Sequence, residues 1–117
     1  MTTTREMLDA SPIDVPFDVA EVAAAIDACL DCSQACVADA DADLVEPDVA
    51  EMRTCIALCL NCADLCDTTA RFLSRPAQWD HFAVNHLLRA CVRVCTTCAE
   101  ECARHADHHA HCAACEK

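Results

Sequence analysis

The chain has 117 residues, of which 13 are cysteine and none is glycine, and its formal net charge at pH 7 is −12. This length suits one domain with a modest core, and the lack of glycine disfavours tight β-turns and phosphate-cradling loops. The negative charge weighs against nucleic acid as a partner and favours cations. The sequence shows no membrane-spanning apolar stretch and no signal-peptide pattern, which predicts a cytoplasmic protein with reduced thiols.

Prolines and helix-start signals divide the chain into predicted elements. A partly helical leader, residues 1–17, precedes residues 18–117, which we expect to form one bundle. Asp18 and Asp48 each begin the sequence Asp-Val-Ala-Glu, which we interpret as a capping box at the start of a helix. The predicted helices cover residues 18–42, 48–74, 78–106 and 107–116. These four predicted helices indicate an all-α protein. Because the connectors between them are short, we expect an antiparallel up-down-up-down four-helix bundle.

The cysteines recur in these helices at steps of three and four residues. Such steps hold the sulfurs within a sector about 60° wide, so each set forms a stripe along one helix face. Apolar residues normally occupy an inward face, and here we expect thiols to line it. In chain order the stripes are Cys29, Cys32 and Cys36; Cys55, Cys59, Cys62 and Cys66; Cys91, Cys95, Cys98 and Cys102; and Cys112 and Cys115.

Extending the stripes predicts two different ends of the bundle. One end is expected to be an apolar plug of Val22, Leu73, Val84 and Leu88. The other end would collect polar ligands: Asp39, Met52, His105, His108 and His111. Met52 is equally well explained as ordinary core. For Asp39 we favour a role in this opening, with pairing to a histidine as the alternative. We interpret His109 as a solvated turn residue, and the acidic run Asp39, Asp41, Asp43, Glu46 and Asp48 as a solvated loop.

Several chemistries use cysteines in number. The odd count and the helix-interior spacing disfavour disulfides, and thirteen cysteines in register are too many for ordinary small hydrophobes. A zinc site needs four ligands and leaves most of the thiols unused, whereas iron–sulfur clusters typically take their cysteines from loops.

Cu(I) fits the pattern better than these metals. It is a soft ion that selects thiolates and thioethers, and each thiolate can bridge to a second ion. One monovalent ion per thiolate also leaves a neutral core, whereas bare buried thiolates are costly. Because the sequence shows no nucleophile with an activating base, we do not expect an enzyme.

The repeated Cys-x3-Cys-x2-Cys-x3-Cys pattern, with the histidine-rich turn and His111-Cys112-x2-Cys115, resembles the cytosolic copper storage proteins over roughly residues 18–117. This resemblance implies a tetramer of four-helix bundles that hold many Cu(I) ions on the thirteen cysteines. It also implies an opening lined by His105, His108 and His111. Two departures predict a lower capacity: Ala25 removes one thiol from the first stripe, and the family's fourth helix usually continues with further cysteines.

Two further hypotheses remain beside copper storage. The alternatives are an iron–sulfur protein with a redox role and a zinc-binding protein that buffers metal. Independently of the metal, the sequence places many apolar residues at outward positions, which predicts a symmetric homo-oligomer. These residues are Ile56, Leu58, Leu60, Leu65, Phe72, Val92 and Val94.

Overall fold

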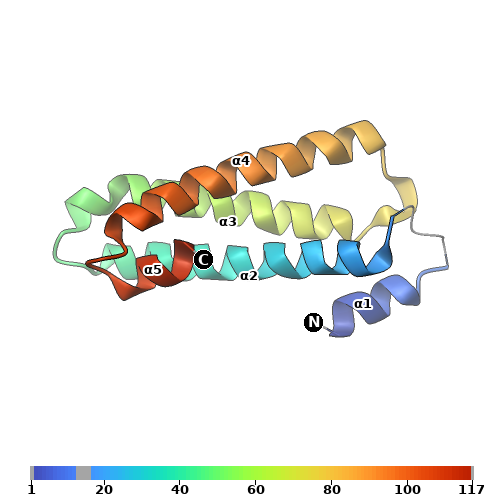
Figure 1. The fold of residues 1–117 in the computed structure, drawn as a ribbon, viewed down its shortest axis with the longest axis horizontal. Helices are drawn as coiled ribbons and strands as arrows, with labels where there is room; N and C mark the ends of the chain where they lie inside the picture. Colours follow the sequence, from blue (N-terminus) through green and yellow to red (C-terminus); the bar gives the residue numbers. More distant parts are fainter. Residues whose placement is uncertain (1, 13–16, 117) are drawn as a thin grey trace.

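The structure, a computed structural model, describes residues 2–12 and 17–116, and within these ranges every regular element is a helix. In chain order the elements are α1 (Thr2–Asp9), α2 (Val19–Leu44), the 3-10 turn η1 (Val49–Met52), α3 (Arg53–Leu73), the 3-10 turn η2 (Pro76–Gln78), α4 (His81–His105) and α5 (Ala110–Glu116). The predicted all-α, antiparallel four-helix bundle is confirmed, with α5 as its short fourth helix (Figure 1).

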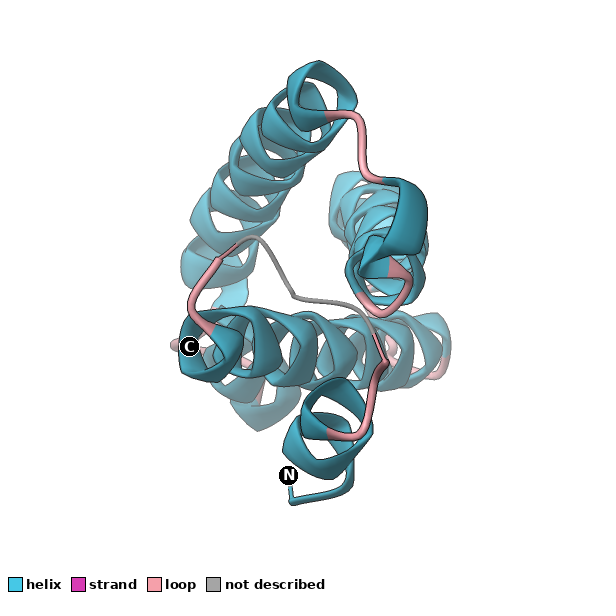
Figure 2. Ribbon diagram, turned by 90° about the vertical axis from the view of Figure 1, so that its right-hand side faces the viewer, coloured by secondary structure: helices cyan, strands magenta, loops and turns pink. Residues whose placement is uncertain are grey.

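The three long helices α2, α3 and α4 surround a common axis (Figure 2). Helix α5 packs against α2 and α4 at one end of this bundle, and α1 lies against α2 near the other end (Figure 1). The molecule is elongated, with principal extents of 52 × 28 × 17 Å. No helix in the described part of the chain is long and apolar enough to cross a membrane.

Aspartates begin two of the long helices. The Asp18 carboxylate accepts a hydrogen bond from the Ala20 backbone N–H at 2.8 Å, and Asp80 caps α4 in the same way. The predicted capping box at Asp48 is wrong, because this carboxylate makes no cap hydrogen bond and bonds to His109 instead. Residues 49–52 consequently form a 3-10 turn, and the regular α-helix begins only at Arg53.

The last predicted helix also begins later than expected. The backbone N–H groups of His108 and His109 both donate to the His105 carbonyl, at 3.1 and 2.9 Å, and so form a turn between α4 and α5. Because this turn breaks the helical phase, α5 begins at Ala110 rather than at residue 107.

Apolar residues close the end of the bundle near α1. Val22, Leu73 and Val84 are buried there as predicted, and Leu8 of α1 joins them. The prediction for Leu88 is wrong, since this side chain is 37% exposed. Helix α5 packs on the other end of α4 and does not cover Leu88. This side chain therefore lines an open groove of about 510 Å³ beside Trp79.

Candidate metal centre

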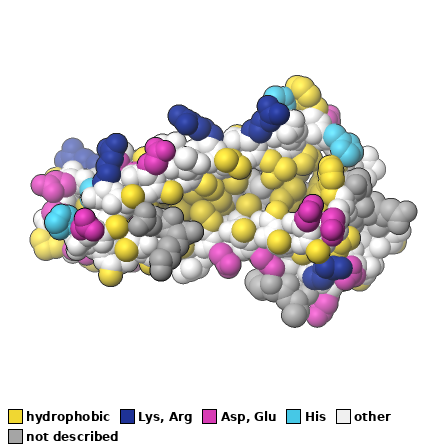
Figure 3. All heavy atoms as spheres, viewed as in Figure 1, with side chains coloured by type: hydrophobic (Ala, Val, Ile, Leu, Met, Phe, Trp, Pro, Cys, Tyr) yellow, Lys and Arg dark blue, Asp and Glu magenta, His cyan; other side chains and the backbone are white. Residues whose placement is uncertain are grey.

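All thirteen cysteines carry free thiols, and their side chains face the interior of the bundle. Nine of them are buried, and the four that are half-buried are Cys29, Cys32, Cys95 and Cys115. A recess of about 250 Å³ between α2 and α4 reaches several of these thiols from the side. In Figure 3 the hydrophobic side chains, cysteine included, form a yellow band in the hollow between α4 and α2. The thiols therefore line a tube that is partly open on this flank.

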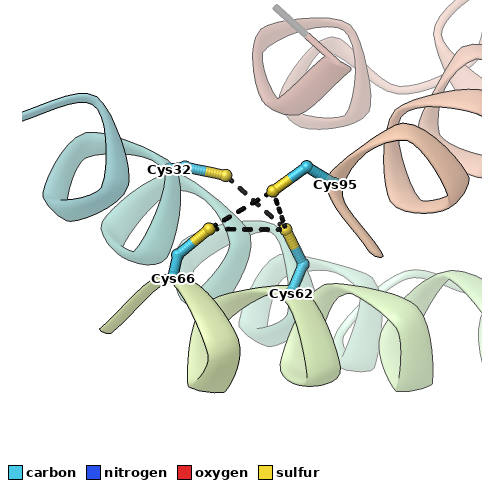
Figure 4. A group of neighbouring side chains, drawn as sticks. All are labelled: Cys32, Cys62, Cys66 and Cys95. Atoms are coloured by element: carbon cyan, nitrogen blue, oxygen red, sulfur yellow. Dashed lines mark hydrogen bonds between the residues drawn. The ribbon is translucent and has the colours of Figure 1, made fainter. Parts of the chain in front are cut away.

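One group of four thiols comes from the three long helices. Cys32 of α2, Cys62 and Cys66 of α3, and Cys95 of α4 point toward one another (Figure 4). Their sulfurs are 3.6 Å apart for Cys32–Cys62, 4.0 Å for Cys62–Cys66 and 3.3 Å for Cys66–Cys95. This spacing lets neighbouring thiolates hold a soft ion together.

Further groups overlap with the first along the axis. Cys66 also lies in a group with Cys29 and Cys91, toward the apolar plug. In the other direction, the next group joins the four helices α2, α3, α4 and α5 and consists of Cys36, Cys59, Cys98 and Cys115. The group after it includes a carboxylate and consists of Asp39, Cys59, Cys102 and Cys115. Cys66 belongs to two of these groups, Cys59 and Cys115 belong to the other two, and the sulfurs of Cys32 and Cys36 are 3.9 Å apart between the two halves. The thiols therefore make one continuous array rather than separate four-ligand sites.

Burial and thiol–thiol hydrogen bonds shift the cysteine pKa values in both directions. Burial raises the pKa of Cys95 to about 11. Hydrogen bonds with Cys102 and Cys115, helped by burial, raise the pKa of Cys59 well above its usual range. Hydrogen bonds from Cys102, Cys36 and Cys59 lower the pKa of Cys115 to about 5. Most buried thiols are therefore protonated without metal, and metal binding must release protons.

Asp39 stands at the end of the tube that α5 covers. Its side chain is 1% exposed, and its Oδ2 accepts hydrogen bonds from the thiols of Cys59 at 3.4 Å and Cys102 at 3.5 Å. Its Oδ1 is hydrogen-bonded to Nδ1 of His111. Met52 is fully buried among the same thiols. The structure thus joins Asp39 to His111 at this end of the tube and places Met52 in the core that these thiols form.

Two of the other histidines differ from the predictions. His108 is exposed and lies outside this cluster, because residues 106–109 form a turn and not the helix whose phase placed it inward. His109 is not a solvated residue: its Nε2 bonds to Asp48 at 3.2 Å, and its ring stacks on His111. The hydrogen bond with His109 lowers the pKa of Asp48. His105 lies at the end of α4, where its Nε2 bonds to Glu101 at 2.8 Å.

Asp43 is the residue that the sequence reading missed. Its side chain is fully buried, so the prediction of a solvated loop is wrong at this position. Its Oδ1 lies 3.4 Å from Nδ1 of His111 and 3.5 Å from the sulfur of Cys112. Asp43 follows Asp39 by four residues, which is the spacing of one helix face. The signal was present, but the predicted helix ended at residue 42 and α2 continues to Leu44.

The pKa values at this end predict that the metal-free protein is more stable in mild acid. Burial, followed by interactions with Cys55 and Asp39, raises the pKa of Asp43 from 3.8 to about 7. Burial alone would lower the pKa of His111, but bonds with Asp39 and Glu46 and nearby negative charges raise it overall. In both cases the folded state binds more protons than the unfolded state, so stability falls as pH rises.

We expect the melting temperature of the reduced, metal-free protein to fall between pH 5 and pH 8. The Asp43 shift corresponds to at most about 3 kcal/mol of stability over this range. Circular dichroism melts at a series of pH values measure it. Asp43→Asn should flatten the dependence, and Asp41→Asn, an exposed site on the same helix, should leave it intact. A wild-type melting temperature that rises with pH contradicts the assignment.

The chain is similar in sequence and structure to known copper storage proteins. It matches the family described as "Copper storage protein" over residues 18–117. The structure of the copper storage protein Ccsp from Streptomyces lividans, loaded with 10 copper equivalents, is 43% identical, with a TM-score of 0.94. That match covers 97% of this chain and 86% of that chain.

A second Streptomyces lividans structure, of a cytosolic copper storage protein with five coppers, is 40% identical, with a TM-score of 0.78. It covers 99% of this chain and 85% of that chain. Among the curated proteins compared, none matches the chain significantly. The family match over residues 18–117 and the agreement of fold with the Streptomyces lividans protein lead to one assignment: the chain belongs to the copper storage protein family.

Proposed function

We propose that this protein binds and stores multiple Cu(I) ions through the thiolates that line its bundle, for copper sequestration and detoxification or for supply. The observation that carries the proposal is the sharing of Cys59, Cys66 and Cys115 between neighbouring groups of thiols. Shared sulfurs suit a soft monovalent ion held by bridging thiolates. One related Streptomyces lividans protein was loaded with 10 copper equivalents, and a second, described as cytosolic, with five coppers. These properties support a cytoplasmic copper store without catalytic turnover.

The alternatives account less well for the array. A zinc buffer would use closed sets of four ligands, each with its own sulfurs. An iron–sulfur protein would take its cysteines from loops around one cluster, whereas these thiols lie along the length of α2, α3 and α4. A continuous line of thiols in regular helices is therefore best explained as a store for many ions.

We propose the thirteen cysteines as the storage ligands. Asp39, Met52 and His111 would receive the ion at the end covered by α5. Asp39 contacts Cys55 and Cys102, His111 is hydrogen-bonded to Asp39, and Met52 is buried in the same core. His105, which is tied to Glu101, and His108, which is exposed, would act only as outer contacts there.

An anaerobic titration of the reduced protein with Cu(I), against a chromogenic chelator, tests this function. We expect uptake on the order of one ion per cysteine before the chelator takes copper. Protein whose thiols have been alkylated in denaturant is the control and should take up almost none. Saturation at one to three ions would exclude storage and favour a small-site metal carrier.

We also propose that the protein forms a homo-oligomer, and a tetramer in line with the family resemblance. Of the outward apolar residues, Leu60 and Val92 are 45% and 66% exposed. Exposed apolar side chains of this size usually mark an interface. We expect multi-angle light scattering at micromolar concentration to give the mass of a tetramer, and Leu60→Glu with Val92→Glu to lower it. Val45→Glu, in an exposed connector, should have no effect, and a monomeric wild type contradicts the proposal.

A further inference from the structure

One carboxylate oxygen in the bundle has no partner to compensate its burial. Asp43 is 0% exposed, and among the described residues its Oδ2 accepts no hydrogen bond. Asp39, one helical turn earlier, is also buried, so two carboxylates lie close together in the interior beside Cys112 and His111. Buried carboxylates are costly unless they are paired or coordinate a metal. Weak hydrogen bonds from thiols, three to Asp39 and one to Asp43, and one imidazole compensate only part of the charge of the two carboxylates.

We infer that Asp39, Asp43, His111 and Cys112 form a binding site for one Zn²⁺ ion, distinct from the all-thiol groups. One donor atom from each of them lies within 4.8 Å of the others. With ordinary zinc–ligand lengths, a tetrahedral site separates N and O by about 3.4 Å, and sulfur from either by about 3.6 Å. In the structure, His111 Nδ1 is 3.4 Å from Asp43 Oδ1, and Cys112 Sγ is 3.5 Å from Asp43 Oδ1 and 3.6 Å from His111 Nδ1.

Asp39 can serve as the fourth ligand once the metal ion replaces the proton that it shares with His111. The hydrogen bond between Asp39 and His111 is shorter than a ligand–ligand edge of a zinc site. The metal ion therefore takes the place of the proton that joins these two side chains, and they separate slightly around it. Binding also removes the proton from Cys112, because only the thiolate is a ligand.

Residues around the site already hold the imidazole in a ligating orientation. Glu46 Oε1 lies 3.0 Å from Nε2 of His111, so Nδ1 faces the carboxylates and Cys112. The ring of His109 stacks on His111 at 5.3 Å between centroids, and His109 is bonded to Asp48. A carboxylate behind a histidine is the usual support of a zinc ligand, since it fixes the ring and raises its basicity.

The donor set selects Zn²⁺ over Cu(I). Two carboxylates, an imidazole and one thiolate suit a borderline divalent ion, whereas Cu(I) prefers the thiolates deeper in the tube. Two carboxylates and a thiolate carry three negative charges, which a divalent ion neutralises better than a monovalent one.

The position of the site gives it a consequence for copper. Asp39 contacts Cys55, Cys59 and Cys102, the first thiols at this end. A zinc ion bound to Asp39 therefore obstructs the access of copper to these thiols. Bound zinc should therefore slow copper exchange through this end. That consequence rests on the proposed storage function, whereas the zinc site itself does not.

Diffraction at the zinc absorption edge, on crystals of the reduced, copper-free protein grown with Zn²⁺, tests the inference. Zinc can also occupy groups such as Cys32, Cys62, Cys66 and Cys95, so position decides the outcome. We expect an anomalous peak between Asp39, Asp43, His111 and Cys112. Asp43→Asn should remove this peak alone, and Asp41→Asn should keep it. Zinc found only among the thiols, or a peak that survives Asp43→Asn, overturns the inference.

A second variant gives a test that does not alter the buried carboxylates. Glu46→Gln removes the charge behind His111, and we expect zinc to bind this site about 10- to 100-fold more weakly. Competition with a chromophoric zinc indicator measures the change against wild type and Asp41→Asn, and an unchanged affinity contradicts the inferred geometry. The copper titration distinguishes the failure of the zinc site from the failure of copper storage. Normal copper capacity without this zinc peak rejects the zinc site alone. The zinc peak together with a capacity of only one to three Cu(I) ions rejects storage alone.

Discussion

Replacing Cys59 by alanine should remove about two to four Cu(I) ions from the saturated protein, more than the single ion expected for one lost thiol. The physical reason is the central position of this sulfur. Cys59 Sγ lies within 4.0 Å of four other sulfurs and 3.4 Å from Asp39 Oδ2. These four sulfurs belong to Cys55, Cys98, Cys102 and Cys115. Without Cys59, two neighbouring groups each lose a ligand at once.

Cys29→Ala is the matched control for this prediction. Cys29 is half-buried at the far end of the tube, beside the apolar plug, in a group with Cys66 and Cys91. Its removal should lower the capacity by about one ion. Anaerobic Cu(I) titration gives both numbers, and circular dichroism verifies that each variant remains helical. Equal losses in the two variants would show that the thiols act independently rather than as bridges.

Replacing His111 by alanine should slow copper uptake and release while leaving the final ion count almost unchanged. His111 is hydrogen-bonded to Asp39, which in turn contacts three thiols, so its imidazole can replace the ligands of an incoming ion stepwise. If this contact lowers the barrier by about 1.4 kcal/mol, its loss slows uptake about tenfold. Stopped-flow mixing of the zinc-free protein with a Cu(I) donor complex measures the rate.

His108→Ala is the control for the kinetic effect. The sequence alone assigned His105, His108 and His111 equal roles at the opening, but His108 is exposed and outside the cluster. Its replacement should leave the rate unchanged, and the triple variant should be about as slow as His111→Ala. Lower pH should also slow the wild type, because a protonated imidazole does not ligate and repels a cation. If His111→Ala loses ions at equilibrium but loads at the normal rate, His111 is a storage ligand instead.

The thiol array could be predicted from the sequence because it depends only on helical periodicity. Residues such as Cys55, Cys59, Cys62 and Cys66 share a face in any regular helix, and α3 is regular through all of them. The apolar plug followed for the same reason, since Val22, Leu73 and Val84 extend the stripes by whole turns. These predictions required no knowledge of how the helices end.

The errors all lie where tertiary contacts decide the local structure. Asp48 had the sequence of a helix cap, but its carboxylate bonds to His109, which is 61 residues away along the chain. His109 contacts the cluster and His108 is exposed, the opposite of the prediction, because residues 106–109 form a turn. Asp43 was missed because α2 is two residues longer than predicted, which brings this carboxylate onto the buried face. The burial of Leu88 depends on where α5 packs along α4, and only the packing of the whole bundle determines that position.

The most direct test of storage by bridging thiolates is diffraction at the copper absorption edge on crystals of the fully loaded protein. We expect copper along the whole tube, from the group of Cys29, Cys66 and Cys91 to the thiols beside Asp39, with most sulfurs bound to two ions. Copper confined to the end near His111, or isolated ions each held by four sulfurs of their own, would contradict a store built from bridging thiolates.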